Sequence, residues 1–384
     1  MDVLRRPNRA TRFCFLGLLV VGALGLVSIY VVSINSPRGL QRFWWGDFEI
    51  THYWTVWTNR TIGFQGARSR TTNQSQPVLP SVIPTPNPDL ESNFSTTLYT
   101  NSYHFICPRN YRFIMDEPGV CETKSPFLVL MVPVAPHNLA ARDAIRRTWG
   151  NETLVRGQLV LTLFLLGLPG GSDAEQQLEN VRQESRTHRD LIQSDFMDSY
   201  INLTIKTMVI MDWLATRCPG ASYAMKIDSD MFLNVQNLVA MLQTPGIPKE
   251  SYLTGMLMWD RPVVRDPGSK WYVPEDMYPY STYPTYTLGM GYVFSNDLPG
   301  KLVEVSKDVQ PFNIEDAYVG ACLKKLGLGP TSPPDPSRWK AYLHTYNRCE
   351  FSSVITYILG GSTQLVEYWT DLHRPEPPCN PTLN

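Results

Sequence analysis

The feature that most constrains this chain is an uncharged, strongly apolar segment at residues 13–34. About 20 consecutive apolar residues are enough to cross a lipid bilayer as one helix. Four arginines precede the segment: Arg5, Arg6, Arg9 and Arg12. Because positive charge stays on the cytoplasmic side, we expect a type II membrane protein with a cytoplasmic tail at 1–12, a signal anchor at 13–34 and a lumenal remainder. A cleaved signal peptide, which has an apolar core of about 7–15 residues, is the alternative.

The next part, residues 35–106, is predicted to be a lumenal stem. Its segment 74–88 is rich in Pro, Ser, Thr and Asn, and such a segment buries too little apolar area to offset the entropy lost on ordering. Acceptor motifs for N-linked glycans occur at five positions: Asn59, Asn73, Asn93, Asn151 and Asn202. Five such motifs fit a chain of the secretory pathway.

The number of cysteines also indicates the secretory pathway, whose lumen is oxidising. Cys14 lies in the apolar segment, and six cysteines follow it: Cys107, Cys121, Cys218, Cys322, Cys349 and Cys379. An even number allows three disulfides in the lumen, although their pairing stays open at this point. Zinc binding is less favoured, because no Cys-x-x-Cys pair or paired His accompanies them.

Charge excludes one large class of function. The chain has 34 basic and 35 acidic side chains and a net charge of −1, whereas a general nucleic-acid binder carries a marked excess of Lys and Arg. We therefore expect no nucleic-acid partner. The length allows two domains or one large α/β domain with appendages.

Beyond Cys107 the pattern alternates between strands and helices. Short apolar runs predict strands at 127–134, 159–168, 190–196 and 223–227. Helical patterns occur at 140–149, 173–188 and 202–216, the second with Ser172 as a candidate N-cap. This alternation predicts a parallel sheet with covering helices, in which ligands bind beyond the carboxyl ends of the strands.

Two carboxylates, Asp228 and Asp230, directly follow the strand predicted at 223–227. At positions i and i+2 of an extended chain they project from the same side. Carboxylate oxygens suit Mg²⁺ or Mn²⁺ that carries a diphosphate. About one Asp-x-Asp is expected by chance in a chain of this length, so the motif gains its weight from its place after a buried strand.

Five longer motifs resemble those of the Golgi β-1,3-glycosyltransferases, glycosyltransferase family 31. They are RDAIRRTWG (142–150), DSYINLTIKT (198–207), KIDSDMFLN (226–234), YPTYTLGMGYVFS (283–295) and EDAYVG (315–320). The segments SPFLVL (125–130) and SKWYVPEDMYP (269–279) are similar to the β-1,3-galactosyltransferase branch, especially its type 2. The resemblance covers about residues 110–369.

The resemblance implies a GT-A (Rossmann-like) α/β catalytic domain at 107–384, behind a single N-terminal transmembrane helix. It also implies inverting transfer from a UDP-sugar to the 3-hydroxyl of an acceptor sugar. One in-line displacement needs a general base for that hydroxyl. By the family pattern Asp316 is the base and Glu315 is its neighbour. Capping of a helix N-terminus is the alternative role for this acidic pair.

The resemblance places the remaining candidates on the donor side. Asp230 is the stronger ligand for Mn²⁺ or Mg²⁺, and Asp228 faces the donor ribose or reaches the metal through water. The other candidates bind the nucleotide sugar: Arg142 and Arg146 clamp uridine or diphosphate, Lys206 and Lys226 counter phosphate charge, and Gly289 and Gly291 let the backbone approach the sugar.

The sequence departs from the family pattern in two places. Thr287 stands where the family commonly has Cys, and Cys107 is an additional cysteine, so the usual disulfides do not transfer intact. We expect the pairs Cys107–Cys121 and Cys349–Cys379 and leave the other two lumenal cysteines unassigned.

The second departure concerns the metal. Ile358 stands where the family has a His that completes the metal shell. Either His344 or His373 replaces that ligand, or water does, or metal affinity is reduced.

We therefore expect an Mn²⁺-dependent galactosyltransferase of the Golgi membrane, which uses UDP-galactose and a terminal GlcNAc-type acceptor on glycoproteins or glycolipids. One alternative is a β-1,3-N-acetylglucosaminyltransferase that uses UDP-GlcNAc. The other is a catalytically weakened, lectin-like or chaperone-like relative. Retention of all three carboxylates, Asp228, Asp230 and Asp316, favours an active enzyme, whereas Ile358 favours a weakened one.

Overall fold

The computed structural model describes residues 110–122, 125–341 and 345–379. The expected cytoplasmic tail, anchor and stem lie outside these residues, as do Cys107, His344 and the glycan motifs at Asn59, Asn73 and Asn93. Within the described ranges, no helix combines the length and the apolar character needed to cross a membrane.

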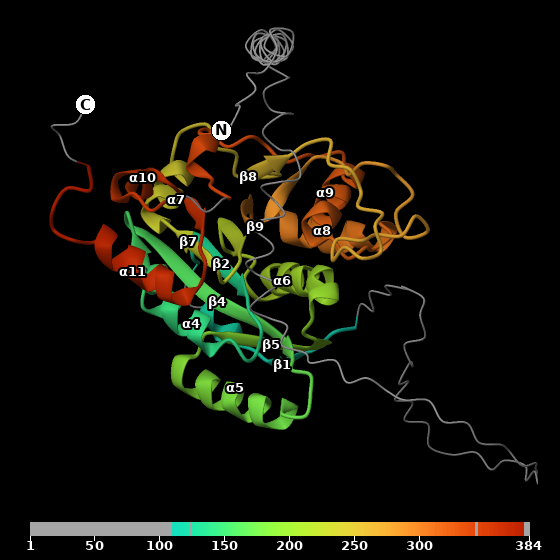
Figure 1. Ribbon diagram of the computed structural model, residues 1–384, viewed down its shortest axis with the longest axis horizontal. Helices are drawn as coiled ribbons and strands as arrows, with labels where there is room; N and C mark the ends of the chain where they lie inside the picture. The colour runs from blue at the N-terminus through green and yellow to red at the C-terminus, as the bar shows by residue number, and fades with distance from the viewer. Residues whose placement is uncertain (1–109, 123–124, 342–344, 380–384) are drawn as a thin grey trace, which may run out of the picture. The chain divides into compact units, whose positions relative to one another are not determined.

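A mixed sheet of eight strands forms the centre of the described part (Figure 1). The strands are β1 (Phe113–Met115), β2 (Leu128–Pro133), β3 (Leu154–Val155), β4 (Gln158–Leu168), β5 (Leu191–Met197), β6 (Tyr223–Ile227), β8 (Leu253–Met258) and β9 (Tyr286–Ser295). Their order is β1-β5-β4-β2-β6-β9-β8, and β3 pairs with β4. The four strands expected from the sequence are all present and pair in parallel. The sheet as a whole is not parallel, however, because β1 runs antiparallel to β5 and β9 runs antiparallel to β6 and β8.

Helices cover both faces of the sheet (Figure 1). They are α4 (Leu139–Arg146), α5 (Ala174–His188), α6 (Leu203–Arg217), α7 (Val235–Leu242), α8 (Leu298–Val305), α9 (Glu315–Lys325), α10 (Arg348–Ser353) and α11 (Ser362–Leu372). The three helices expected from the sequence are α4, α5 and α6. The N-cap of α5 is Asp173 rather than Ser172. Every residue of β2 is buried, which explains its uninterrupted apolar sequence.

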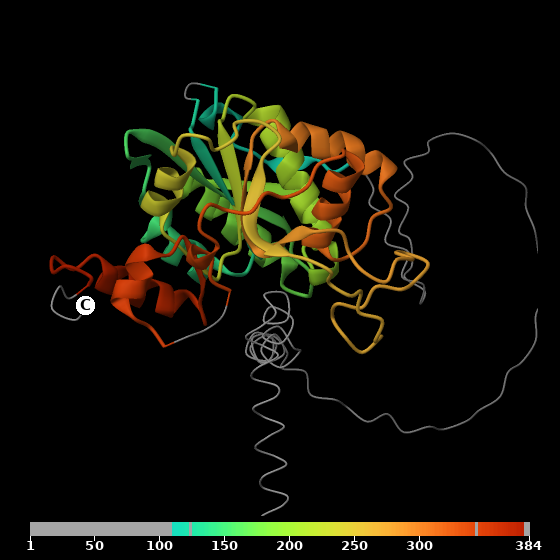
Figure 2. The ribbon, with the colours of Figure 1, turned by 90° about the horizontal axis from the view of Figure 1, so that it is seen from above.

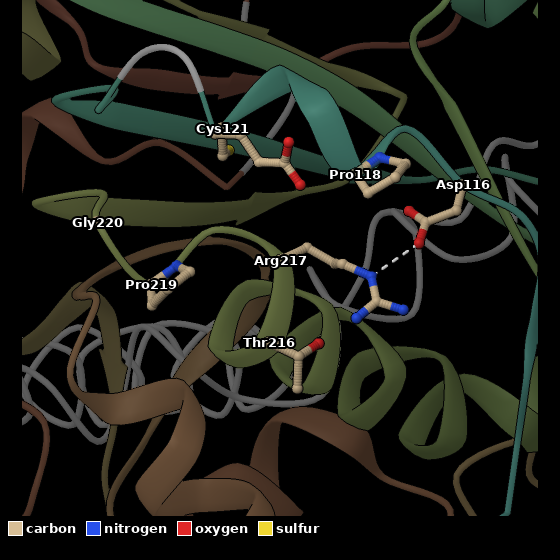
Figure 3. A pocket seen from close by; sticks show the side chains of 8 residues that line it. Asp116, Pro118, Cys121, Thr216, Arg217, Pro219 and Gly220 are labelled. Atoms are coloured by element: carbon tan, nitrogen blue, oxygen red, sulfur yellow. Dashed lines mark hydrogen bonds and ion pairs between the residues drawn. The ribbon is translucent and has the colours of Figure 1, made fainter.

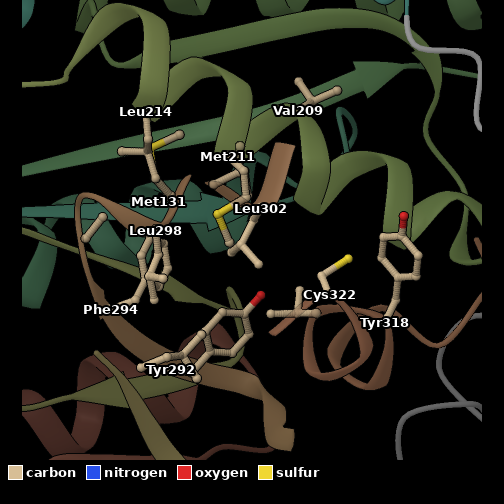
Figure 4. Close-up of a cluster of buried hydrophobic side chains, with 14 of the residues drawn as sticks. Met131, Val209, Met211, Leu214, Tyr292, Phe294, Leu298, Leu302, Tyr318 and Cys322 are labelled. Atoms are coloured by element: carbon tan, nitrogen blue, oxygen red, sulfur yellow. The ribbon is translucent and has the colours of Figure 1, made fainter. Parts of the chain in front are cut away.

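The larger core lies between one face of the sheet and helices α6, α8 and α9. Figure 4 shows side chains of these three helices converging with Tyr292 and Phe294 of β9. These two strand residues are two apart and so point to the same face. Packing in this core fixes α9, whose first turn carries Glu315 and Asp316, against β9.

A smaller second sheet follows the main one. It consists of β7 (Met231–Leu233) and β10 (Thr356–Ile358), which pair antiparallel. Figure 2 shows the C-terminal helices, drawn in red, at the end of this part that is remote from the orange α8 and α9. Strand β10 brings the C-terminal segment next to the chain that leaves β6.

The disulfides correct one expected pair and confirm the other. Cys349 and Cys379 are bonded, as expected. Cys121 is bonded to Cys218, not to Cys107, because Cys121 precedes β2, Cys218 precedes β6, and these two strands are neighbours in the sheet. Cys322 is buried in α9 and belongs to neither bond.

A cavity of about 430 Å³ lies beside the Cys121–Cys218 bond (Figure 3). Arg217 and Asp116 face each other across it, with the Arg217 Nε atom 2.9 Å from Asp116 Oδ2. Its lining includes Gly220, which precedes the amino end of β6. The cavity is therefore at the end of β6 opposite to Asp228 and Asp230, and none of the predicted site residues lines it.

Candidate active site

The Asp-x-Asp turn connects β6 to β7 and is held by backbone hydrogen bonds on both sides. The N–H of Asp228 donates to the Met290 carbonyl of β9 at 2.9 Å. The N–H of Leu359, which follows β10, donates to the Asp230 carbonyl at 3.0 Å. Two strands distant in sequence therefore fix the backbone that carries both carboxylates.

Trp149 also supports this turn, although sequence reasoning gave it no role. Its indole Nε1 donates to the carbonyl of Met231 at 3.1 Å, and its side chain is fully buried. A buried indole needs a hydrogen-bond acceptor, and this requirement could have indicated from the sequence that Trp149 supports a neighbouring backbone segment. The neighbouring Gly150 has no room for a side chain, since a Cβ there would lie 2.7 Å from the side chain of Ile145.

Lys226, expected to counter phosphate charge, bridges two acidic residues of the site. Its Nζ lies 2.7 Å from Asp228 Oδ1 and 3.0 Å from Glu315 Oε1, and it also donates to the Gly289 carbonyl. The side chain is only 5 % exposed. A buried ammonium requires such compensation, and the two carboxylates raise the pKa of Lys226 despite its burial.

The acidic pair at the start of α9 consists of two carboxylates in different surroundings. Glu315 is buried and accepts hydrogen bonds from the Thr207 hydroxyl at 2.8 Å and the Tyr292 hydroxyl at 3.3 Å. Asp316 is only partly buried, and its carboxylate accepts the backbone N–H groups of Gly289 at 2.9 Å and Ala317 at 2.8 Å. Asp316 is thus the member of the pair with a side chain that solvent reaches more easily.

The two glycines of β9 make room for protein groups. A Cβ on Gly289 would lie 2.7 Å from Glu315 Oε1 and 3.1 Å from Asp316 Oδ2. A Cβ on Gly291 would lie 3.2 Å from Met225 Cε in the core. The absent side chain of Gly289 therefore permits the close approach of β9 to the acidic pair.

Two carboxyl groups of the site, those of Asp316 and Asp230, have pKa values raised to about 7. Burial, and secondly the charge of Glu315, raises the pKa of Asp316 to about 7. Burial, and secondly the charge of Asp228, raises the pKa of Asp230 to about 7. For Asp316, a pKa close to the working pH suits a group that takes up a proton during reaction.

Tyr200, in the turn before α6, lies near these carboxylates and next to the connection between β8 and β9. Burial raises the pKa of Tyr200, and the charges of Asp316 and Asp228 raise it further. The Lys270 Nζ atom lies 5.4 Å from the centroid of the Tyr200 ring and 5.1 Å from that of Trp271. The β8–β9 connection therefore borders the site at Tyr200.

Arg142 and Arg146 have acidic partners within the protein. Arg142 is 1 % exposed and donates to both Glu184 oxygens, at 2.7 and 2.6 Å, and to two backbone carbonyls. Arg146 pairs with Glu184 at 2.7 Å and with Asp190 at 2.8 Å. These charge-assisted bonds tie α4 to α5 and to the start of β5. The structure thus gives both arginines a structural role, and their expected role in clamping the donor stays a prediction.

Lys206 likewise has internal partners. Its buried Nζ donates to the Val134 carbonyl at 3.0 Å and to Asp198 Oδ2 at 2.7 Å. Burial is the main cause that lowers the pKa of this lysine. The contacts link α6 to the ends of β2 and β5, and the expected role of Lys206 in countering phosphate charge stays a prediction.

The oxygen donors near β6 fit a hard divalent cation. Asp228 and Asp230 supply carboxylate oxygens, the ligand type that Mg²⁺ and Mn²⁺ prefer. Among the ion pairs of the described ranges, Asp228 contacts Lys226, and Asp230 takes part in none. Ile358 is fully buried in β10 opposite Met231, the residue after Asp230.

His373, one of the two histidines expected to replace the family ligand, is engaged elsewhere. The ring of His373 bonds the Trp369 carbonyl at 2.8 Å. The described ranges contain no cluster of three His, Cys, Asp or Glu suited to a metal.

Comparisons with known proteins agree with the motifs. A family model described as galactosyltransferase matches residues 140–334. Beta-1,3-galactosyltransferase 2 of Mus musculus is 41 % identical over 283 residues, which are 73 % of this chain and 65 % of that protein. The chain thus spans slightly less than two thirds of that relative. Beta-1,3-galactosyltransferase 1 of Mus musculus is 40 % identical over 268 residues, 70 % of this chain and 80 % of that protein.

Among solved structures, the apo form of the bifunctional glycosyltransferase WbbM aligns with 65 % of this chain and 50 % of its own, at a TM-score of 0.36 and 11 % identity.

Proposed function

The chain belongs to the galactosyltransferase family, and from this premise we propose that it transfers galactose from UDP-galactose, with inversion and in β-1,3 linkage, to a GlcNAc-type acceptor on glycoproteins or glycolipids. One observation carries the proposal: a partly exposed carboxylate, Asp316, with a pKa raised to about 7, sits in the same charge network as the Asp-x-Asp turn. An inverting transfer needs these two parts together.

Asp316 is the proposed general base. Its two accepted backbone N–H bonds hold the carboxylate in one orientation while leaving lone pairs for an acceptor hydroxyl. A base with a pKa near 7 is ionised in half of the molecules at that pH, yet it retains enough basicity to take the proton.

Asp228 and Asp230 are the proposed donor-side groups. Both project from the turn that β9, β10 and Trp149 hold in place. Mn²⁺ or Mg²⁺, when bound there, supplies positive charge that offsets the charge on the departing UDP. The contact between Asp228 and Lys226 orients this carboxylate for the ion or the ribose.

A Golgi location also belongs to the proposal. It rests on the apolar segment 13–34, the four arginines before it and the glycan motifs of the stem. Protease added to sealed Golgi vesicles should leave the C-terminal part intact, and digestion of that part without detergent would reject the type II orientation.

One observation favours a weakened relative as the second candidate. Ile358 cannot bind a metal, and its place in β10 beside the Asp-x-Asp turn is where a third ligand could act. Reduced metal affinity would lower the transfer rate without changing the fold.

A donor-by-acceptor screen tests the proposed function. The full-length chain, purified in detergent, is assayed with UDP-galactose and UDP-GlcNAc, with several acceptor sugars, and with Mn²⁺ or a chelator. We expect β-1,3-linked galactose on a GlcNAc-terminated acceptor, and loss of that product with chelator and in Asp316→Asn. Asp297→Asn, which removes a partly buried carboxylate at the start of α8, is the matched control and should keep transfer. Absence of transfer to every acceptor, with UDP binding retained, would favour the weakened relative.

A further inference from the structure

A buried ion pair, Lys226 with Glu315, lies between Asp228 on the proposed donor side and Asp316 on the proposed acceptor side. Asp228 contacts Lys226, Lys226 contacts Glu315, and Glu315 precedes Asp316 in the chain. The side chains of Lys226 and Glu315 are 5 % and 8 % exposed, whereas that of Asp228 is 36 % exposed. The ion pair therefore connects the proposed donor side to the proposed acceptor side through the protein interior.

The Glu315 carboxylate is fully engaged by protein groups. It accepts from Lys226 of β6, Thr207 of α6 and Tyr292 of β9. A carboxylate with one cationic and two hydroxyl donors loses strong hydrogen bonds if it moves. Glu315 is consequently unsuited to take a proton from an acceptor, and it fastens the first turn of α9 to three other elements.

The orientation of Asp316 depends on the same contacts. Its Oδ2 atom accepts the N–H of Gly289, and the carbonyl of Gly289 accepts from Lys226. Lys226 thus holds both the strand that binds Asp316 and the glutamate that precedes it. Loss of either Lys226 or Glu315 would remove the side-chain link between the first turn of α9 and β6, so that core packing and the Gly289 N–H bond alone would orient Asp316.

We propose that Glu315 and Lys226 are positioning residues for sugar transfer, because their buried ion pair fixes Asp316 relative to the Asp-x-Asp turn. The inference rests on the proposed function, in which Asp316 is the base. It gives Glu315 a role distinct from that of a second base, and Lys226 a role distinct from that of a phosphate ligand.

The charges around Asp316 provide a readout that a purely structural role would not move. The titratable groups that influence Asp316 or are influenced by it are Glu315, Lys226, Tyr200, Tyr283, Tyr286 and Tyr292. The negative charge of Glu315 raises the pKa of Asp316, and the positive charge of Lys226 lowers it. Neutralising Glu315 should therefore lower the pKa of Asp316, and neutralising Lys226 should raise it.

The test compares Glu315→Gln and Lys226→Met with Glu184→Gln. Glu184 is a matched control, since its side chain is also 8 % exposed and pairs with a buried arginine in α4, away from α9. All three variants should lose thermal stability. Only the first two should lower kcat for transfer, by about 10- to 100-fold, as expected for a misplaced catalytic group, and Glu315→Gln should leave the KM for UDP-galactose unchanged.

The acidic limb of the pH–rate profile should move to lower pH in Glu315→Gln, to higher pH in Lys226→Met and not at all in Glu184→Gln. An unchanged kcat and pH profile in Glu315→Gln would overturn the inference. If Glu315→Gln does not fold, Thr207→Val removes one donor to Glu315 and should lower kcat by at least about threefold; an unchanged kcat there would also overturn it.

Carbodiimide labelling separates this inference from the proposed function. The pH midpoint for labelling of Asp316, followed by mass spectrometry, reports its ionisation without an acceptor. Opposite shifts of the midpoint in the two variants, with no transfer by the wild type, would reject the function but keep the geometry. Normal transfer with unmoved midpoints would reject the positioning role alone.

Discussion

Asp316→Asn should abolish transfer and, at alkaline pH, stabilise the protein. The carboxylate is held in a partly buried position next to the charge of Glu315, which raises its pKa from 3.8 to about 7. A carboxyl group with a raised pKa in the folded state favours folding at low pH, and this contribution is lost as the pH rises toward 7. Ionised Asp316 therefore destabilises the fold where the base is active.

The size of the effect follows from the shift. A change from 3.8 to about 7 corresponds to about 4 kcal/mol, at about 1.4 kcal/mol per pKa unit. Asn has one acceptor oxygen, so one of the two backbone N–H groups that Asp316 binds loses its acceptor, which costs about 1 kcal/mol. Solvent around the partly exposed side chain screens a further part. We expect Asp316→Asn to raise the free energy of unfolding by about 2 kcal/mol at pH 8, or Tm by about 4–8 °C.

Thermal unfolding of the wild type and the variant at pH 8 and pH 5 measures this effect. At pH 5 the gain should nearly vanish, because the wild type has by then lost only about 2 kcal/mol, from 1.2 pH units above 3.8 at about 1.4 kcal/mol per unit, and the lost hydrogen bond and the screening offset most of it. Transfer by the variant should fall by about 10²–10⁴, while UDP binding with Mn²⁺ stays close to that of the wild type. Retained transfer, or the same change in stability at both pH values, would refute the reasoning.

Three further predictions concern the supports of the site. Gly289→Ala should reduce transfer by at least about tenfold with UDP binding retained, because the new Cβ would lie 2.7 Å from Glu315 Oε1; steady-state kinetics and calorimetry check this, and wild-type kcat would contradict it. Cys121→Ser should lower the free energy of unfolding by about 2–5 kcal/mol in chemical denaturation, and peptide mapping should still find the Cys349–Cys379 bond; a stability equal to that of the wild type would reject a structural role for the Cys121–Cys218 bond. Ile358→His should tighten Mn²⁺ binding in calorimetry if β10 faces the metal, and unchanged affinity would show that the ligands are completed elsewhere.

Local patterns in the sequence were sufficient for much of the fold. The strands β2, β4, β5 and β6 and the helices between them appear where apolar runs and helical periodicity predict them, because burial of these runs is decided by their own composition. The position of the Asp-x-Asp turn after β6 followed from the same pattern. The antiparallel strands β1, β8 and β9 were not predicted, since their pairing depends on partners far along the chain.

The roles of individual charged residues were decided only in three dimensions. Sequence indicated that Arg142 and Lys226 carry positive charge near a nucleotide-binding motif, yet Arg142 pairs with Glu184, 42 residues away, and Lys226 with Glu315, 89 residues away. Cys121 similarly bonds Cys218, 97 residues away, because β2 and β6 are neighbours. Sequence determines which groups need a partner, since a buried charge or thiol has the same chemistry in any fold, but the packing of distant elements determines which partner comes within reach.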